Sequence, residues 1–274
     1  MNKKQISMLG CGWLGSSLAE YLIAENYYIK ASTTTEKKLS QLEKKGIQAF
    51  KIQLFENKIE GDIENFLNES SILIINIPPG LRSQPNLDYV AKMKNFIQAI
   101  KNSKIKKVIY VSSTSVFSDK KSIPTYTENY EFTHSEIQNS QLIQVEKAFQ
   151  NQVNFQTSIV RFGGLVGKDR HPVKYLAGRK NVKNPLAPVN LIHKKNCIKL
   201  LNAILKQQAF GTVFHGVENI PVNKSTFYSS AAKKYNLEEP QFDTTTTKSV
   251  GKVINAKQTQ TKLKIEFEQL VQNI

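Results

Sequence analysis

The chain has 274 residues, is 40% hydrophobic and carries a formal net charge of +16. This length allows one large core or two modest ones, and no stretch approaches the roughly 18 uninterrupted apolar residues of a membrane helix. Two cysteines exclude a disulfide framework, and no signal-peptide-like region precedes the first predicted strand, so we expect a cytoplasmic protein. Nearly all of the 38 basic residues are lysines spread along the chain, which favours a solvated basic surface over a nucleic-acid partner.

A glycine-rich turn lies near the head of the chain. The run Gly10-Cys11-Gly12-Trp13-Leu14-Gly15 follows a predicted strand at 6–9 and precedes an apolar pattern with helical spacing. In this order, the G-x-G-x-x-G spacing is typical of dinucleotide binding. Gly10 would allow the tight turn, Gly12 would let a pyrophosphate approach the backbone, and Gly15 would let helix and strand pack closely. The phosphates would lie at the helix N-terminus, beside Trp13 and Leu14.

Strand and helix signals then alternate along the chain. Further strands are predicted at 27–31, 47–54, 72–77, 108–111 and 157–160, and helices at 36–45, 87–100 and 135–150. Such alternation predicts a parallel sheet with helices on both faces. We therefore expect a Rossmann-type, doubly wound α/β domain over residues 1–165.

The remaining residues, 166–274, are less regular and predict a smaller substrate-binding lobe. Helices are expected at 197–205 and at 223–235, where Asn223 would be the N-cap, and a strand is expected at 212–217. A last amphipathic helix would present four apolar side chains on one face, namely Leu263, Phe267, Leu270 and Val271.

The strand ends suggest which cofactor binds. Ligands of such sheets lie beyond the carboxyl ends of the strands, so the turn at 10–15 should meet Thr33, Thr34, Thr35, Ile77, Pro78 and Ser112. An NAD site places an acid near position 33 to accept a hydrogen bond from the ribose 2′-hydroxyl, but no acid occurs between Lys30 and Thr35. A carboxylate would repel a 2′-phosphate, whereas threonine hydroxyls and Lys37 could bind one. We predict NADP as the cofactor, ahead of NAD.

Three motifs give the chain a family resemblance. They are the turn at 10–15 and the runs Tyr110-Val111-Ser112-Ser113-Thr114-Ser115-Val116-Phe117 and Arg161-Phe162-Gly163-Gly164-Leu165-Val166-Gly167. Together they resemble the extended short-chain dehydrogenase/reductase superfamily, which includes NAD(P)-dependent sugar-nucleotide epimerases and dehydratases. Arg170-His171-Pro172 and Ala187-Pro188-Val189-Asn190 are similar to its atypical, YeeZ-like branch. The resemblance implies that the first glycines hold the cofactor's pyrophosphate.

The resemblance also implies a catalytic role for Ser113, whose hydroxyl would bind a substrate oxygen where charge develops. A serine that only closes the strand is the alternative. The superfamily's catalytic Tyr-x-x-x-Lys pair has no counterpart, because aligning Glu146 with the acid after that pair puts Gln138 and Leu142 at its positions. Substitute phenols are Tyr126 or Tyr130, or Tyr175 beside Arg179, although a tyrosine packed for its ring is the alternative reading of each.

A cationic loop follows the strand predicted at 157–160. If Arg170, His171 and Arg179 face the crevice, they form a substrate-binding pocket for a phosphate or carboxylate. The ligand would then be a small anionic molecule such as a nucleoside-diphosphate sugar, and a solvated loop is the alternative. The four histidines lack metal-ligand spacing, so we expect no metal site.

Two functions stay open from the sequence. The first is an NADP(H)-dependent oxidoreductase or sugar-nucleotide epimerase-like enzyme acting on a small polar substrate. The second is a non-catalytic, redox-responsive regulatory protein that reads NADP(H). The missing Tyr/Lys pair favours the regulator, whereas Ser113 and the arginine-bearing loop favour the enzyme. A homodimer also stays open as the assembly.

Overall fold

The computed structural model describes residues 4–81, 83–243, 245 and 248–273. The chain divides into two compact units, and each is built from three separate segments. The first unit comprises Met1–Ser112, Glu131–Val160 and Leu201–Val213, and the second comprises Ser113–Tyr130, Arg161–Leu200 and Phe214–Ile274. The two units therefore interleave along the chain, whereas the sequence predicted one boundary after residue 165.

A seven-stranded sheet confirms the predicted Rossmann-type α/β fold. Its strands run in the order β12-β9-β7-β6-β1-β2-β3, and each neighbouring pair from β7 to β3 is parallel. The strands are β1 (Gln5–Leu9), β2 (Tyr28–Thr33), β3 (Gln48–Lys51), β6 (Ile72–Ile75), β7 (Lys107–Ser113), β9 (Gln156–Phe162) and β12 (Val213–Gly216). The chain order reverses beside β1, which lies between β2 and β6, and ligands of doubly wound sheets bind at this switch point.

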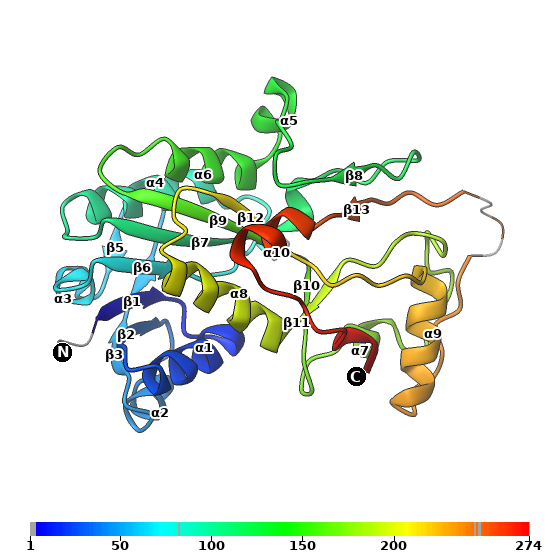
Figure 1. Ribbon diagram of the computed structural model, residues 1–274, viewed down its shortest axis with the longest axis horizontal. Coiled ribbons are helices and arrows are strands. Elements are labelled where there is room, and N and C mark those ends of the chain that lie inside the picture. The colour runs from blue at the N-terminus through cyan, green and yellow to red at the C-terminus, as the bar shows by residue number, and fades with distance from the viewer. Residues whose placement is uncertain (1–3, 82, 244, 246–247, 274) are drawn as a thin grey trace. The chain divides into compact units, whose positions relative to one another are not determined.

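Helices cover both faces of this sheet in the first unit (Figure 1). One face carries α1 (Trp13–Ala24) and α2 (Glu36–Glu43), and the other carries α4 (Tyr89–Lys101) and α6 (Gln141–Gln150). Two smaller features complete this unit between β3 and β6. They are the antiparallel hairpin of β4 (Gln53–Leu54) and β5 (Ile59–Glu60), and the short helix α3 (Ile63–Leu67).

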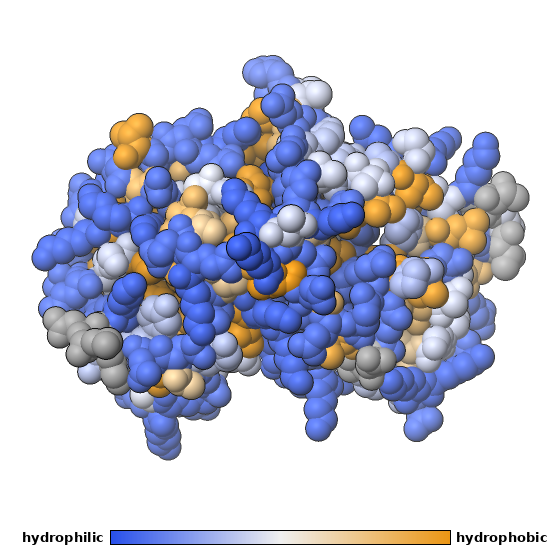
Figure 2. All heavy atoms as spheres, in the orientation of Figure 1, coloured by the Kyte–Doolittle hydropathy of each residue, from blue (hydrophilic) through white to orange (hydrophobic). Residues whose placement is uncertain are grey.

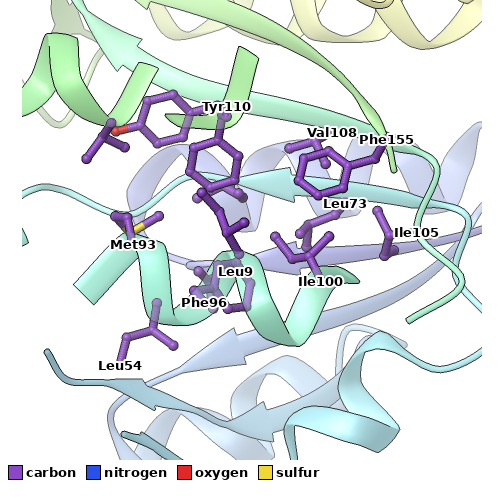
Figure 3. Close-up of a cluster of buried hydrophobic side chains, with 14 of the residues drawn as sticks. Leu9, Leu54, Leu73, Met93, Phe96, Ile100, Ile105, Val108, Tyr110 and Phe155 are labelled. Atoms are coloured by element: carbon purple, nitrogen blue, oxygen red, sulfur yellow. The ribbon is translucent and has the colours of Figure 1, made fainter. Parts of the chain in front are cut away.

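The main core of the first unit lies between the sheet and α4 (Figure 3). Leu9 and Tyr110 reach it from β1 and β7, and Met93 and Phe96 reach it from α4. None of these four side chains is more than 1% exposed. The Tyr110 hydroxyl lies 3.1 Å from the Tyr89 hydroxyl, so the polar ends of two buried rings satisfy each other. This packing holds the strands whose carboxyl ends form the site.

The second unit is built from shorter elements. Two pairs of short strands are parallel, β8 (Thr125–Tyr126) with β13 (Val253–Ile254), and β10 (Gly164–Val166) with β11 (Leu191–His193). Its helices are α7 (Val173–Leu176), the first half of α8 (Lys194–Gln207), α9 (Lys224–Lys234) and α10 (Lys257–Leu263), and 3-10 turns lie at Thr114–Val116 and Val271–Asn273. A separate apolar cluster that includes Val173, Leu191 and Phe227 forms its core.

Several predicted elements are confirmed, and three differ. The helices predicted at 197–205 and 223–235 are α8 and α9, and Asn223 caps α9 as expected by accepting from the Thr226 amide at 2.9 Å. The strand predicted at 47–54 is split into β3 and β4. The last predicted helix ends at Leu263 and does not reach Val271, because Lys264 adopts the left-handed conformation with φ +48°.

The helix predicted at 135–150 is broken in two. The first part is α5 (His134–Gln138), and the second part is α6. Asn139 ends α5, and Ser140 starts α6 as its N-cap, with its hydroxyl accepting from the Ile143 amide at 3.4 Å. A capping serine gives the backbone an alternative to continuing the preceding helix, which accounts for the break.

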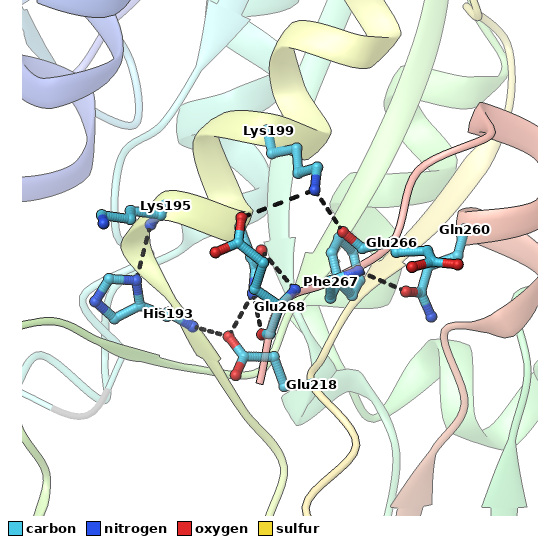
Figure 4. A network of polar contacts seen from close by, with 9 residues as sticks. His193, Lys195, Lys199, Glu218, Gln260, Glu266, Phe267 and Glu268 are labelled. Carbon is cyan, nitrogen blue, oxygen red and sulfur yellow. Dashed lines mark hydrogen bonds and ion pairs between the residues drawn. The ribbon is translucent and has the colours of Figure 1, made fainter. Parts of the chain in front are cut away.

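A buried carboxylate, Glu218, joins distant segments of the second unit (Figure 4). Its Oε1 accepts from the His193 amide at 2.8 Å. Oε1 also accepts from the Asn196 side chain at 2.7 Å, and Oε2 accepts from the Val271 amide at 2.8 Å. Asn196 also bonds both main-chain polar groups of Glu268. Glu218 is only 2% exposed, so these bonds fix the start of α8 to the C-terminal segment in a dry environment.

The face of the molecule in Figure 2 is mostly hydrophilic, with apolar side chains in small separate groups. Surface ion pairs such as Lys45 with Glu20, 2.6 Å apart, join side chains that are both well exposed and that add little to stability. None of the helices in the described part of the chain has the length and apolar character that a membrane crossing requires.

Candidate functional site

The turn at 10–15 has no room for a side chain at two of its three glycines. Gly10 has φ +96°, and a Cβ there would lie 2.4 Å from the Asn76 carbonyl oxygen. A Cβ on Gly15 would lie 2.4 Å from the Gly10 carbonyl oxygen. The turn is therefore pressed against the chain that leaves β6 and against the first turn of α1. These are the tight turn and the close helix–strand packing that the glycine spacing predicts.

Gly12 differs from the other two glycines, because a Cβ there would meet no atom within 4 Å. It is exposed and is the N-cap residue of α1, and no side chain makes a capping hydrogen bond to this helix. The chain continues into the helix through the half-buried Trp13 and the buried Leu14. The positive end of the α1 dipole is therefore open to an anionic group from outside the chain.

Ser32, near the end of β2, holds the turn in place. Its Oγ accepts from the Gly10 amide at 3.0 Å, and its carbonyl oxygen accepts from the Cys11 amide at 2.8 Å. The Cys11 thiol is buried, and burial raises its pKa to about 11. Cys11 is therefore a protonated packing residue and not a reactive thiolate.

The threonines at 33–35 supply hydroxyl groups where β2 ends. Thr33 is largely buried, and its Oγ1 accepts from the Thr35 amide at 3.2 Å. Thr34 and Thr35 are exposed. No carboxylate occurs between Lys30 and Thr35, so the end of β2 offers donors and no negative charge.

A cavity of about 850 Å³ opens beside the turn, within the first unit. Its lining includes most of the predicted cofactor-binding residues, namely Gly10, Gly12, Thr33, Thr34, Thr35, Ile77 and Pro78. Trp13, Leu14, Gly15 and Ser112 do not line it. A cavity of this volume with an open helix N-terminus fits a phosphorylated ligand of dinucleotide size.

The other walls of the cavity come from segments without a recognisable motif in the sequence. Residues 52–57, from β4 and the loop after it, form one wall, and residues 79, 80, 83, 84, 87 and 92 contribute another, up to α4. Among the residues that the structure describes, the charged ones in the lining are Lys38, Glu56 and Lys92. The sequence pointed to Lys37, which does not line the cavity, whereas its neighbour Lys38 does. Glu56 and Lys92 carry no local signal in the sequence.

Ser112 and Ser113 end β7. Ser112, in the first unit, is buried and donates from Oγ to Oε1 of Glu146 at 2.6 Å. Ser113 is the first residue of the second unit, and its Oγ accepts from the Ser115 amide at 3.1 Å. Because a hydroxyl that accepts in this way keeps its own proton, Ser113 can still donate to another oxygen.

The residues aligned with the Tyr-x-x-x-Lys pair have no acid or base chemistry. Gln138 is exposed at the end of α5. Leu142, near the start of α6, packs against the apolar core of the first unit. The break at Asn139 and Ser140 lies between these two positions.

Among the substitute phenols, the structure distinguishes three environments. Tyr126 is buried, and its hydroxyl donates to the Ser118 carbonyl oxygen at 3.0 Å. Tyr130 is half-buried and packs edge-on against Phe117, with ring centroids 5.6 Å apart. Tyr175 is 70% exposed. Tyr126 is therefore already engaged within the second unit, as a tyrosine packed for its ring would be.

His171 does not carry the positive charge expected from the sequence. It is 1% exposed, and its ring lies 5.9 Å from the Phe227 ring and 5.1 Å from the Tyr235 ring. Its Nδ1 accepts from the Val173 amide at 3.2 Å. Burial, with nearby lysines adding to it, lowers the pKa of His171 to about 4, so the ring is neutral at pH 7.

Arg170 and Arg179 are both exposed in the second unit. Arg170 sits in a tight turn in which its amide and carbonyl each bond to Gly167, at 2.9 and 2.8 Å. These two arginines keep their charge in any environment and can bind an anion with paired donors. Within the residues that the structure describes, no group of three or more His, Cys, Asp or Glu side chains is placed to hold a metal ion.

Comparisons with known proteins agree with this geometry. The model of the NAD(P)H-binding family matches residues 10–189. Protein YeeZ of Escherichia coli K12 is 26% identical over 268 residues, which cover 97% of this chain and 96% of YeeZ. UDP-glucuronic acid 4-epimerase from Bacillus cereus, solved with NAD, has a TM-score of 0.73 at 14% identity, covering 98% of this chain and 95% of that chain.

A second solved structure, Gre2 from Candida albicans in complex with NADPH, has a TM-score of 0.72 at 14% identity and covers 98% of this chain and 96% of that chain. At this identity, the solved structures establish the fold alone. The family model covers more than half of the chain and begins at the glycine turn. The chain belongs to the NAD(P)H-binding family and is similar to Protein YeeZ over nearly its whole length.

Proposed function

We propose that this protein binds NADP(H) in preference to NAD(H) and works as an oxidoreductase or epimerase-like enzyme on a small anionic substrate. The observation that carries the proposal is the cavity of the first unit. There the open Gly12 and the uncapped start of α1 share one lining with three threonines and Lys38. The two cysteines, Cys11 and Cys197, are both free and buried, which supports a place in the reducing cytoplasm.

The preference for NADP(H) follows from the chemistry at the end of β2. A ribose 2′-hydroxyl needs an acceptor such as a carboxylate, whereas a 2′-phosphate needs donors and positive charge. Threonine hydroxyls and Lys38 are of the second kind. Calorimetric titration of the purified protein with NADPH and with NADH tests this preference, and tighter binding of NADH would overturn it.

The nicotinamide, when bound, supplies or accepts a hydride. The chain's own contribution is a hydroxyl at Ser113, which we expect to donate a hydrogen bond to a substrate oxygen as charge develops there. Tyr126, Tyr130 and Tyr175 are the candidates for moving a proton, and Tyr175 is the most exposed of the three. If Ser113 has this role, Ser113→Ala should lower turnover at least about tenfold while leaving NADPH affinity unchanged.

We propose an anionic substrate because Arg170 and Arg179 supply two guanidinium groups. The neutral His171 adds no positive charge to them. A double variant, Arg170→Ala with Arg179→Ala, should bind nucleoside-diphosphate sugars at least about tenfold more weakly than the parent protein. To detect turnover, both the nicotinamide absorbance and the reaction products must be measured, because an epimerase returns its cofactor unchanged. Unchanged binding of every sugar nucleotide by the double variant would contradict an anionic substrate at these arginines.

A second candidate function is a regulatory protein that senses NADP(H) without turning over a substrate. Leu142 in the apolar core and the exposed Gln138 favour it, since neither side chain titrates. This candidate predicts tight NADPH binding, no turnover of any sugar nucleotide or aldehyde, and a change in amide hydrogen exchange in the second unit when NADPH binds. Turnover that Ser113→Ala abolishes would exclude it.

A further inference from the structure

Lys92 lies on the second turn of α4 and lines the same cavity as the glycine turn. Its side chain is half-buried, and burial lowers its pKa. No carboxylate in the described part of the chain lies within ion-pair distance of it. A partly desolvated ammonium group without a counterion costs free energy, and an anionic ligand would offset that cost.

Two carboxylates around the start of α4, Glu56 and Asp88, accept hydrogen bonds from main-chain amides. The Glu56 carboxylate accepts from the Asp88 amide at 2.8 Å, and the Asp88 carboxylate accepts from the Ala91 amide at 2.8 Å. The first bond holds the N-cap residue of α4, and the second caps the first turn of that helix. The charge of Lys92 is therefore available to a ligand in the cavity.

We infer that Lys92 is a second cation for the 2′-phosphate of NADP(H), acting together with Lys38. This inference rests on the proposed preference for NADP(H) and adds a residue from a different segment of the chain. Among the described lining residues, Lys38 and Lys92 are positively charged and only Glu56 is negatively charged, so positive charge is in excess. The threonines at 33–35 add hydroxyl donors. A phosphate accepts bonds from lysine and from hydroxyl groups, so this set of donors matches a phosphomonoester.

The test compares Lys92→Met with Lys92→Arg, which keeps the charge, and with Lys94→Met as a control at an exposed position of the same helix. Thermal unfolding first establishes that each variant is folded, and calorimetry then measures affinity for NADPH and NADH. We expect Lys92→Met to bind NADPH at least about tenfold more weakly with little change for NADH, Lys92→Arg to retain most of the affinity, and Lys94→Met to match the parent.

The outcomes separate this inference from the proposed function. If the parent protein binds neither dinucleotide or prefers NADH, the proposed function fails and the inference fails with it. If the parent prefers NADPH and Lys92→Met binds it equally well, the inference alone is overturned. An equal loss for NADPH and NADH would also overturn it, since Lys92 would then contact the part of the dinucleotide that both share, such as the pyrophosphate.

Discussion

The start of α1 in the first unit and the starts of α8 and α10 in the second differ in what satisfies their main-chain amides. In the first unit, α1 begins at Gly12, which has no side chain, and no other side chain caps the helix. In the second unit, buried carboxylates accept from the corresponding amides. Glu218 accepts from His193 at the start of α8, and Glu128 accepts from Thr259 in the first turn of α10, both at 2.8 Å. The start of α1 has main-chain donors to offer a ligand, whereas the amides at α8 and α10 join segments of their own unit.

This difference separates binding from stability. An uncapped helix N-terminus contributes less to folding than a capped one, but it can bind an anion without displacing a side chain. A buried carboxylate that accepts hydrogen bonds from other segments joins them, and a change that removes its charge leaves those donors poorly satisfied. Substitutions in the first unit's cavity should therefore change affinity, and substitutions at the second unit's carboxylates should change unfolding.

The largest effect is expected inside the glycine turn. Gly10→Ala places a Cβ against the Asn76 carbonyl at φ +96°, so we expect the free energy of unfolding to fall by about 3 kcal/mol. Gly12→Ala meets no atom and should leave unfolding unchanged, but its methyl group would stand where the phosphates approach and should weaken NADPH binding at least about tenfold. Denaturant unfolding and calorimetry measure the two effects, and equal destabilisation by both variants would contradict the distinction.

The next effect tests the closed helix start in the second unit. Glu218→Gln puts an amide donor where the carboxylate accepts three hydrogen bonds, and we expect a loss of about 2 kcal/mol in the free energy of unfolding. NADPH affinity should be unchanged. Glu266→Gln, at an exposed position, is the matched control and should unfold like the parent protein. If Glu218→Gln lost NADPH affinity but kept the parent's free energy of unfolding, Glu218 would serve binding and not stability, contrary to this prediction.

Acid should also act on the second unit, through His171 and His215. Burial lowers the pKa of each ring to about 4, against 6.5 for a free histidine, so the unfolded chain binds more protons between these values. Stability should be fully present above pH 6.5 and should have fallen by about 2 kcal/mol per histidine at pH 5. His171→Asn, which keeps an acceptor for the Val173 amide, should unfold with a shallower pH dependence, whereas His134→Gln on the exposed start of α5 should keep the parent's slope.

The smallest effect sharpens the cofactor preference of the first unit. Thr33→Asp can still accept from the Thr35 amide but adds a negative charge at the end of β2. We expect NADPH affinity to fall roughly tenfold, about 1.4 kcal/mol, with no loss for NADH. Thr33→Asn is the uncharged control of the same shape. If both variants lose the same affinity, charge at this position does not select the cofactor.

The sequence was most informative where local backbone rules decide the structure. The strand at 6–9, the turn and the helix after it follow from glycine conformations and apolar periodicity, which need no distant contacts. The walls of the cavity at 52–57 and around Lys92 could not be predicted in this way, since they reach the site only through the pairing of β3 with β2 and the packing of α4.

The sequence also could not predict which polar side chains are buried. Nothing around Glu218 in the sequence indicates that its carboxylate is buried, because its donors come from residues 193, 196 and 271. His171 was misjudged for the same reason, since its stacking partners lie more than fifty positions away. The apolar pattern continues to Val271, so it predicted a helix that runs past Lys264. The helix ends before that residue because Lys264 adopts the left-handed conformation, which the pattern does not reveal.

The break between α5 and α6 limits whether a tyrosine–lysine pair could be introduced at positions 138 and 142. Residues four positions apart share a helical face only while the helix is continuous. Positions 138 and 142 belong to different helices, with Asn139 and Ser140 between them. Gln138→Tyr combined with Leu142→Lys would therefore not recreate a tyrosine–lysine dyad. Engineering such a dyad into this chain would first require joining the two helices, because the main chain as well as the two side chains must change.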